Sequence, residues 1–275
     1  MSEFRHQAIA PTRARPLPGG TTVDPHFHDQ HQIVYAGRGV LSVQTDAGVW
    51  VAPTSRAIWI PAGTVHQHRA YGDTVLYTVG LPVDEEAAAG PGHAAGDTGI
   101  GAGVLGLSTP AVLEVGPLLR ELLLSYVDGD PQESPARRRL RSVLLDQLQP
   151  ATERSLQLPT PTDDRLLRAA AILAEQPELT SMRELARRCG CSDRTLSRLC
   201  RDQLAMTLPQ WRTQIRLHRA LRLLAEGETV TAVARATGWS TPSAFIDVFR
   251  RVLGSTPGRA RPHSRANRTD GRAAG

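Results

Sequence analysis

The chain has 275 residues and is 40% hydrophobic, which suits about two domains with ordinary cores. No apolar run approaches the ~20 residues of a membrane span, and the N-terminus lacks the apolar segment of a secretory signal. Its three cysteines do not suggest a disulfide framework. We therefore expect a cytoplasmic protein that does not enter a membrane.

Charge is divided unevenly along the chain. Residues 1–162 hold 12 arginines and 16 acidic residues, a net charge of −4, whereas residues 163–275 hold 20 arginines and 11 acidic residues, a net charge of +9. A basic domain beside a mildly acidic one indicates that only the C-terminal part meets a polyanion. A solvated surface with a basic tail at 259–272 would give the same balance, so charge alone does not decide the partner.

Short segments rich in β-branched and aromatic residues fill the region from Thr21 to Pro82. They lie at 33–35, 40–43, 49–51, 57–60 and 75–79. Turn residues separate them at 37–39, 46–48, 61–63 and 72–73. Such a series predicts a small antiparallel sandwich or barrel, forming a domain over residues 1–83.

The middle of the chain alternates between linkers and helical patterns. An Ala/Gly-rich stretch predicts a flexible linker over 84–109, and a Pro-rich stretch predicts a second over 150–162. Between them, two segments with helical spacing, 110–127 and 134–148, form a helical segment over 110–149. This segment is a candidate for a homodimer contact or for transmission between domains. The polar residues 263–275 predict a disordered tail.

Two similar helical units follow from Asp163 onward. In the first, Ser181 can cap a helix with Glu184 in the capping-box position, Gly190 permits a sharp turn and Ser192 can cap a second helix. In the second unit, which lies about fifty residues later, Gly238 makes the turn and Thr241 caps the second helix. A helix over 208–225 joins the two units. Two helix-turn-helix units on one rigid helix would present two recognition helices about one turn of DNA (~34 Å) apart.

At this point the sequence resembles the AraC/XylS-type transcriptional regulators, over residues 163–261. The matching residues are Leu185-Ala186, Ser192, Leu196-Ser197-Arg198, Arg216-Leu217, Ala220, Leu223-Leu224, Val233-Ala234, Gly238-Trp239, Ser243-Ala244-Phe245, Phe249-Arg250-Arg251 and Gly254-Ser255-Thr256-Pro257. Three residues depart from the family pattern: Cys200 in place of Phe, Ala205 in place of Gly, and the acidic Asp247 on the second recognition helix. The resemblance implies a DNA-binding domain over 163–262.

Direct readout of DNA is expected from the outward faces of the second helix of each unit. In the first unit these positions are Asp193, Arg194, Ser197 and Arg198, with Arg201 better placed for a phosphate. In the second unit they are Thr241, Ser243, Asp247 and Arg250. Arginine is the commonest bidentate partner of guanine, and an acid can accept from cytosine. The alternative is that all of them are ordinary solvated polar residues.

The pair Cys189 and Cys191 could suggest a metal site. A zinc ion needs about four ligands, and the nearest histidine in sequence, His218, is distant. Cys189 and Cys200 also fall on the inner faces of their helices, so we expect structural burial rather than metal binding.

Histidines in the N-terminal domain follow the spacing of the cupin superfamily. The first motif matches at Gly20, His26, His28, Gln32 and Gly39, and the second over 61–66, ending at His66. In metal-binding cupins two histidines, an acid and the later histidine meet inside the barrel on a divalent ion. The resemblance places His26, His28, Gln32 and His66 there.

Two departures weaken that ligand set, because Gln32 replaces the usual Glu and Ala70 replaces the final Asn. His31 and His68 could compensate. Three imidazoles could still hold a divalent metal such as Zn, Fe or Ni. A metal-free pocket for a small organic effector, or interior histidines satisfied by hydrogen bonds, are the alternatives.

Together these patterns predict an α+β multidomain protein: a cupin-like barrel, a helical middle segment and an all-α tandem helix-turn-helix domain. We expect a sequence-specific regulator that binds promoter or operator DNA and responds to a small-molecule effector, and not an enzyme. A metal-dependent cupin enzyme with a helical appendage is the alternative, although it leaves the tandem units unexplained. Non-specific DNA compaction is a third possibility.

Overall fold

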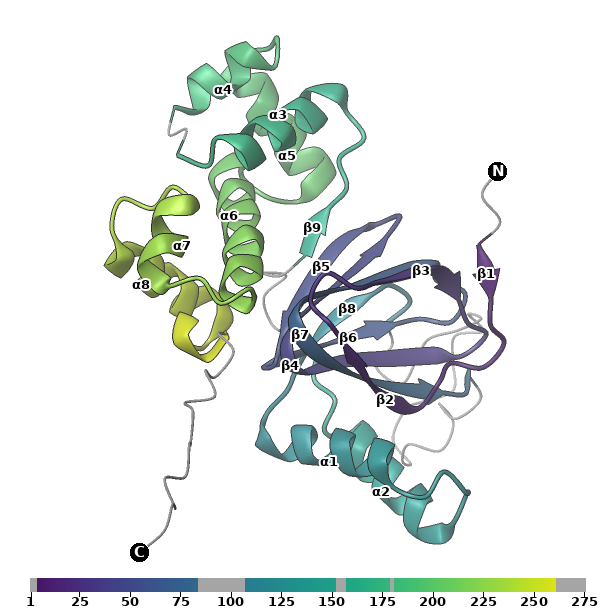
Figure 1. Cartoon of the computed structure of the whole chain (residues 1–275). Coiled ribbons are helices and arrows are strands. Elements are labelled where there is room, and N and C mark those ends of the chain that lie inside the picture. Colours follow the sequence, from purple (N-terminus) through teal and green to yellow (C-terminus); the bar gives the residue numbers. More distant parts are fainter. Residues whose placement is uncertain (1–3, 84–106, 152–156, 179–180, 261–275) are drawn as a thin grey trace, which may run out of the picture.

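The computed structural model describes residues 4–83, 107–151, 157–178 and 181–260. Figure 1 shows a curled sheet of strands, a pair of helices (α1 and α2) against one side of it, and a C-terminal group of helices against another. The predicted linker 84–109 lies almost entirely outside the described residues, and the predicted tail 263–275 lies wholly outside them.

Nine strands within the described residues form one sheet. They are β1 (Arg5–His6), β2 (Arg13–Leu17), β3 (Thr22–Phe27), β4 (His31–Thr45), β5 (Gly48–Pro53), β6 (Arg56–Ile60), β7 (His66–Leu81), β8 (Ala111–Glu114) and β9 (Gln157–Pro159). The order is β1-β3-β7-β4-β5-β9, with β2 paired to β7, and β6 paired to both β4 and β8. All pairs are antiparallel except β1 with β3. This confirms the predicted antiparallel β-domain.

Two of the predicted turns are wrong. Residues 37–39 lie inside β4 and residues 72–73 lie inside β7, which pair with one another along most of their lengths. The register shifts between Ala36 and Arg38, and again between Arg38 and Val40. The glycines therefore permit bulges that bend two long strands, rather than ending four short ones.

Both faces of the central strands are buried. Ile33 and Tyr35 of β4 pack with residues of α1 and α2, whereas Val34 and Ala36 point to the opposite side and join the larger core. Successive side chains of a strand point to opposite faces, so a strand covered on both sides reads as a continuous apolar run.

The helical middle segment begins later than predicted. Residues 111–114 form β8 along the edge of β6, so the expected helix over 110–127 is wrong in its first turns. Helix α1 (Pro117–Asp128) starts with a proline, a residue favoured at the first helical position, and α2 (Pro135–Asp146) does the same. In the predicted linker 150–162, β9 pairs with β5.

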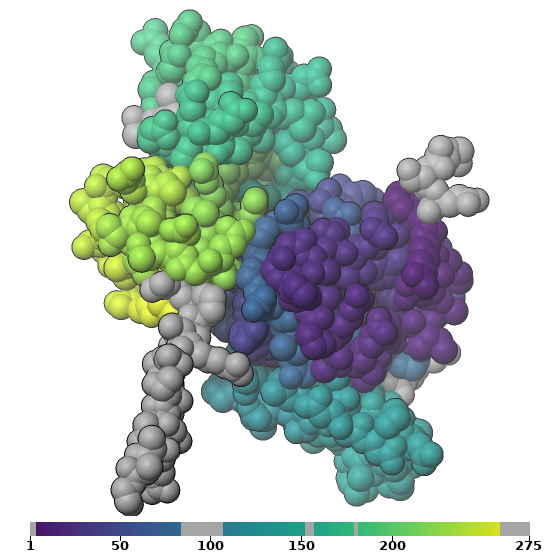
Figure 2. Space-filling view, viewed as in Figure 1, coloured from purple at the N-terminus to yellow at the C-terminus, as the bar shows by residue number. Residues whose placement is uncertain are grey.

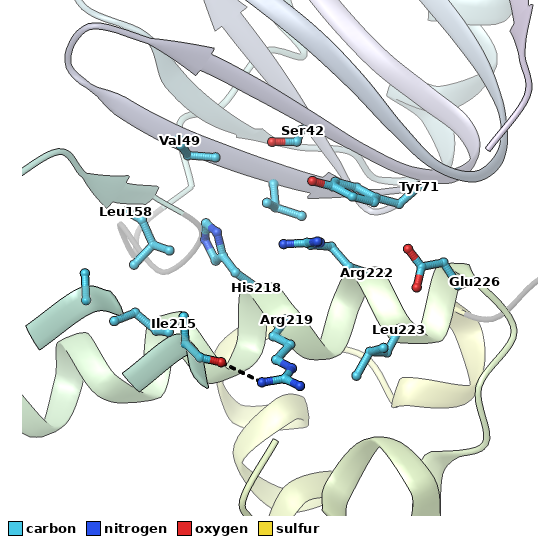
Figure 3. A pocket seen from close by; sticks show the side chains of 13 residues that line it. Ser42, Val49, Tyr71, Leu158, Ile215, His218, Arg219, Arg222, Leu223 and Glu226 are labelled. Atoms are coloured by element: carbon cyan, nitrogen blue, oxygen red, sulfur yellow. Dashed lines mark hydrogen bonds between the residues drawn. The ribbon is translucent and has the colours of Figure 1, made fainter. Parts of the chain in front are cut away.

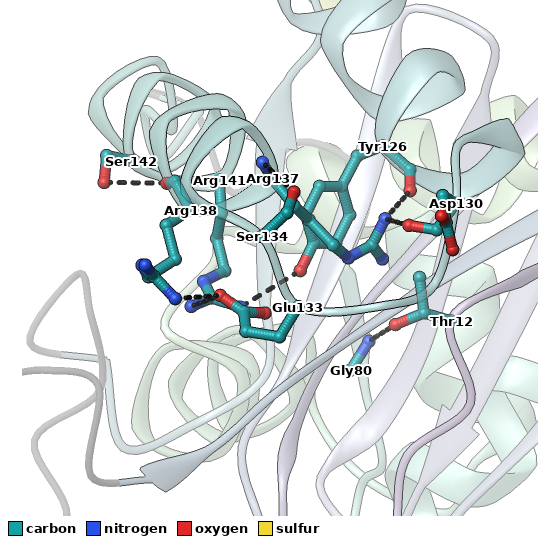
Figure 4. Close-up of polar contacts among 10 residues, drawn as sticks. All are labelled: Thr12, Gly80, Tyr126, Asp130, Glu133, Ser134, Arg137, Arg138, Arg141 and Ser142. Carbon is teal, nitrogen blue, oxygen red and sulfur yellow. Dashed lines mark hydrogen bonds and ion pairs between the residues drawn. The ribbon is translucent and has the colours of Figure 1, made fainter.

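Polar contacts fasten the turn between α1 and α2 (Figure 4). Arg137 donates hydrogen bonds to the carbonyl oxygens of Tyr126 (3.1 Å) and Asp130 (2.9 Å), and its guanidinium lies 4.0 Å from the centroid of the Tyr126 ring. Glu133 forms ion pairs with Arg138 and Arg141. These contacts fix the two helices as one hairpin on the sheet.

The C-terminal domain consists of short helices that begin at capping side chains. They are α3 (Asp164–Glu175), α4 (Met182–Arg188), α5 (Asp193–Leu204), α6 (Leu208–Ala225), α7 (Val230–Ala236) and α8 (Pro242–Leu253), followed by a 3-10 turn (Pro257–Ala260). Figure 2 shows the C-terminal helices beside the barrel, and α6 is the helix of this group that packs on β4, β5, β7 and β9. Across the described ranges, no helix combines the length and the apolar character that a bilayer span requires.

Candidate functional site

The first helical unit is α4 and α5 joined at a left-handed glycine. Gly190 has φ +73°, and the Ser192 hydroxyl accepts a hydrogen bond from the Thr195 amide at 3.1 Å, which caps α5. The Ser181 hydroxyl caps α4 through the Glu184 amide, as the sequence predicts. The Glu184 carboxylate bonds Arg187 instead of returning to the cap, so the capping box is half formed.

The outward face of α5 carries the predicted readout residues. Asp193, Arg194, Arg198 and Arg201 are exposed and Ser197 is partly buried. The opposite face, formed by Leu196, Cys200 and Leu204, is buried. One carboxylate oxygen of Asp193 accepts a hydrogen bond from the Arg194 amide at 2.9 Å, so this side chain also bonds a backbone amide in the first turn of α5.

The second unit repeats this arrangement. Gly238 has φ +74°, and the Thr241 hydroxyl caps α8 by accepting from the Ala244 amide at 3.1 Å. Exposed side chains on α8 and its cap include the four predicted positions, Thr241, Ser243, Asp247 and Arg250. Phe245, Phe249 and Leu253 form its buried face. Helices α5 and α8 therefore each have an exposed polar face opposite a buried apolar face.

Helix α6 joins the two units and holds the second one in place. Arg216, only 8% exposed, donates from Nε to the carbonyl oxygen of Thr237 at the end of α7, and its guanidinium lies over the Trp239 ring. Burial lowers the pKa of Arg216 to about 10, so it remains charged at neutral pH. One side chain thus ties the connecting helix to the turn that orients α8.

Histidines from two strands meet inside the barrel. His26 of β3 is directly opposite His66 of β7, and His68 lies two residues further along on the same face of β7. The ring centroid of His26 is 5.0 Å from that of His28, 4.4 Å from that of His66 and 5.5 Å from that of His68. All four are buried.

Backbone carbonyls orient three of these rings. Nδ1 of His26 bonds the Asp24 carbonyl at 2.7 Å, Nδ1 of His66 bonds the Thr64 carbonyl at 2.8 Å, and Nδ1 of His28 bonds the Gln7 carbonyl at 3.0 Å. A carbonyl only accepts, so Nδ1 carries the proton and Nε2 keeps its lone pair in each neutral ring.

Burial also keeps three of these rings uncharged. Desolvation lowers the pKa of His66 to about 3, and lowers those of His28 and His68 below the ordinary histidine value, with neighbouring imidazoles adding to each shift. These three rings are therefore neutral near pH 7, the form in which imidazole binds metal ions or accepts hydrogen bonds.

Comparisons with known families match both parts of the chain. A family described as "AraC-like ligand binding domain" matches residues 17–148, and a "Helix-turn-helix domain" family matches residues 185–263. The chain belongs to the AraC-type transcriptional regulators. It is a DNA-binding regulator with an N-terminal ligand-binding domain of the cupin-like kind.

Individual relatives agree with this assignment. The regulator is 29% identical over 237 residues to the HTH-type transcriptional regulator NimR of Escherichia coli, spanning 85% of this chain and 80% of NimR. It is 37% identical over 81 residues to the HTH-type transcriptional regulator GlxA of Rhizobium meliloti, spanning 29% of this chain and 25% of GlxA. These relatives are regulators, and nothing in the comparisons favours the cupin enzyme.

Among solved structures, ToxT from Vibrio cholerae O395 aligns over 90% of this chain and 95% of its own, with 10% identity and a TM-score of 0.36. The DNA-binding domain of AdpA in complex with a target DNA aligns over 40% of this chain and 100% of its own, with 33% identity and a TM-score of 0.35.

Inside the barrel, the regulator brings together the predicted His26, His28 and His66, and Gln32 lies beside His28 at 3.4 Å. Sequence reasoning left the role of His68 open, although the alternation of His66 and His68 along one strand would have placed both on one face. His31 does not join the cluster: it stacks on Trp59 at 4.9 Å, and its Nδ1 accepts from the Ala62 amide.

The cysteines of the regulator lie as expected. Cys189 and Cys200 are buried, and Cys191 is partly buried. Burial raises the pKa of Cys200 to about 12 and also raises that of Cys189. Both shifts follow from the burial of the thiols among packed side chains.

A cleft of about 630 Å³ separates part of the barrel from α6 (Figure 3). Tyr71 of β7 forms one wall, with the Arg222 guanidinium of α6 4.7 Å from its ring centroid. Close by, Gly72 packs against the end of α6, where an added Cβ would stand 2.1 Å from the Ala225 carbonyl oxygen. No local pattern in the sequence indicated this contact between the ligand-binding domain and the helix shared by both units.

Proposed function

We propose that the regulator reads operator DNA with the exposed faces of α5 and α8, and that a small effector bound in the histidine-lined barrel alters this reading. The observation that carries the first half is the exposure of Arg194 and Arg198 on α5, opposite a fully apolar buried face. Exposed arginines on the second helix of such a unit are suited to bidentate contact with guanine.

The remaining side chains take secondary roles in this proposal. Arg201, near the end of α5, contacts a phosphate, and Ser197 and Asp193 tune the choice of base. On α8, Ser243 and Arg250 approach the duplex, Asp247 accepts from a cytosine amino group, and Thr241 acts chiefly as a cap.

Effector control requires that the barrel and the DNA-binding units influence each other's conformation. The barrel packs on α6, which is common to both units, through Tyr71 and Gly72. An effector with different affinities for two arrangements of this contact would shift operator affinity. A regulator that works on the chromosome acts in the cytoplasm.

Pairing of two chains is also part of the proposal. Leu118 of α1 is 55% exposed and Val143 of α2 is 45% exposed, and in this proposal both apolar side chains are covered by a second copy of the chain. Sedimentation of wild-type protein and of a Leu118→Glu, Val143→Glu double variant tests this. We expect a dimer that the double variant converts to a monomer; a monomeric wild type would contradict pairing.

The test of DNA reading is footprinting and fluorescence anisotropy on the promoter regions flanking the gene. We expect specific, nanomolar binding that Arg194→Ala plus Arg198→Ala abolishes. Arg168→Ala, which removes an exposed arginine from α3, is the control and should leave specificity unchanged. Equal affinity for all sequences with a steep salt dependence would instead indicate non-specific compaction and reject the proposal.

A further inference from the structure

Three imidazoles of the barrel form a more compact set than the cupin-like motif indicates. His26, His66 and His68 each present a ring nitrogen, and these three atoms lie within 4.8 Å of one another. All three side chains are buried, with exposed fractions of 6%, 1% and 2%. The set draws on two strands whose register places His26 opposite His66 and His68 on the same face.

Two nitrogens of this set lack hydrogen-bond partners among the described residues. They are Nε2 of His66 and Nδ1 of His68, and both are fully buried. A buried polar atom without a hydrogen-bond partner destabilises the folded protein. A cation bound between these neutral imidazole nitrogens would accept their lone pairs. This interaction would offset the missing hydrogen bonds.

The hydrogen bonds made by Nδ1 orient the rings of His26 and His66 for metal binding. Through Nδ1, His26 and His66 each bond the carbonyl oxygen of the residue two positions earlier in the chain, which fixes the ring and leaves Nε2 free for a ligand. Metal-binding histidines characteristically carry such a second bond from the other ring nitrogen.

His28 differs from the three. Its Nδ1 bonds the Gln7 carbonyl, and its Nε2 accepts from the amide nitrogen of Gln32 at 3.4 Å. Both ring nitrogens are thus engaged, and Gln32 supplies no charge. The two residues that the motif adds to His26 and His66 therefore bond each other, while Oε1 of Gln32 has no hydrogen-bond partner among the described residues.

We infer that the barrel binds one divalent transition-metal ion through His26, His66 and His68. Imidazole nitrogens suit ions such as Zn²⁺, Co²⁺, Ni²⁺ and Cu²⁺, whereas Mg²⁺ and Ca²⁺ prefer oxygen ligands. The metal ion would then be the ligand of the barrel site. Only its effect on DNA binding rests on the proposed function. Zinc bonds of about 2.0–2.1 Å place tetrahedral ligand atoms about 3.4 Å apart, so the rings close slightly on binding.

Metal binding is measured on the full chain without DNA, so its failure is separate from failure of operator binding. Protein dialysed against a chelator is titrated with Zn²⁺ by calorimetry and with Co²⁺ by visible absorption. We expect one ion per chain, and a loss of affinity on the order of 100-fold or more in His68→Gln. His28→Gln is the matched control, a buried histidine two residues from His26, and should change affinity by less than about tenfold.

Circular dichroism and thermal melting show whether each variant folds. If His68→Gln does not fold, pulsed electron paramagnetic resonance of the wild-type Cu²⁺ form counts the bound imidazoles without any substitution. Three imidazoles on the copper support the inference. No stoichiometric uptake by wild-type protein, fewer than three bound imidazoles, or a loss in His28→Gln as large as in His68→Gln would each overturn it.

Discussion

The guanidinium carbon of Arg216 lies 3.9 Å from the centroid of the Trp239 ring, while its Nε donates to the carbonyl of Thr237. This stacked, charge-assisted contact fastens α6 to the turn before α8. One buried arginine in the helix that joins the two units therefore helps to set the orientation of the second reading helix, together with the apolar core that α6 shares with α7 and α8.

Replacing Arg216 by alanine should destabilise the second unit by about 2–4 kcal/mol, because a desolvated cation–π contact and a charged hydrogen bond are both lost. Urea unfolding of the full chain measures this change. Arg235→Ala removes an exposed arginine of α7 and should change stability by less than about 0.5 kcal/mol. Similar values for the two variants would show that the stacked contact contributes little.

The second prediction concerns the end of α5. Ala205 is the one residue other than glycine with positive φ in the described ranges, at φ 52°. A Cβ in the left-handed region costs roughly 1 kcal/mol, and the sequence departs from the family's glycine here. Ala205→Gly should therefore raise stability by about 0.5–1 kcal/mol, seen as a higher midpoint in thermal unfolding.

The matched control makes the same chemical change within a helix. Ala220 is buried in the interior of α6 with helical backbone geometry. Ala220→Gly should lower stability by at least about 1 kcal/mol, because glycine is a poor helix former and a buried methyl group is lost. If Ala205→Gly also lowered stability, the left-handed cap would not be strained.

Much of this fold follows from local patterns in the sequence. Caps at Ser181, Ser192 and Thr241 and the turn glycines 190 and 238 located the helical units, because these devices act within a few residues. The outward faces of α5 and α8 were predicted for the same reason, since the helical period of 3.6 residues fixes which side chains share a face.

The missed features depend on partners distant in sequence. Glycine is typical of turns, so the sequence predicts turns at glycines 37, 39 and 72. These positions become bulges within long strands because β4 pairs with β7. Residues 111–114 and 157–159 are strands because free sheet edges accept them. Alternation along one strand puts His66 and His68 on the same face, but their place beside His26 depends on the register between β3 and β7.

The third prediction tests the contact between barrel and DNA-binding domain. Gly72 has φ +64°, and a Cβ there would stand 2.1 Å from the carbonyl oxygen of Ala225 in α6. Because a backbone carbonyl cannot easily move aside, Gly72→Ala should separate the barrel from α6. We expect faster proteolysis between the two domains and a larger radius of gyration in solution scattering.

Gly63→Ala separates this effect from backbone strain alone. Gly63 has a similar φ of +76°, but no atom of the described residues would lie within 4 Å of a Cβ added there. It should lose a comparable amount of stability without any change in scattering. Identical scattering for both variants would indicate that the contact at Ala225 does not hold the domains together.

The last prediction concerns thiol reactivity. The thiolate is the reactive form, and burial raises the pKa of Cys200 to about 12 and that of Cys189 above its usual value. A raised thiol pKa means less thiolate at any pH below it, so both residues should resist alkylation at pH 8. Cys191 is partly exposed and should react first. Timed labelling with iodoacetamide, followed by peptide mass spectrometry, gives the order. Labelling of Cys200 as fast as Cys191 in folded protein, with full labelling of all three in denaturant as the reference, would contradict the buried packing of α5.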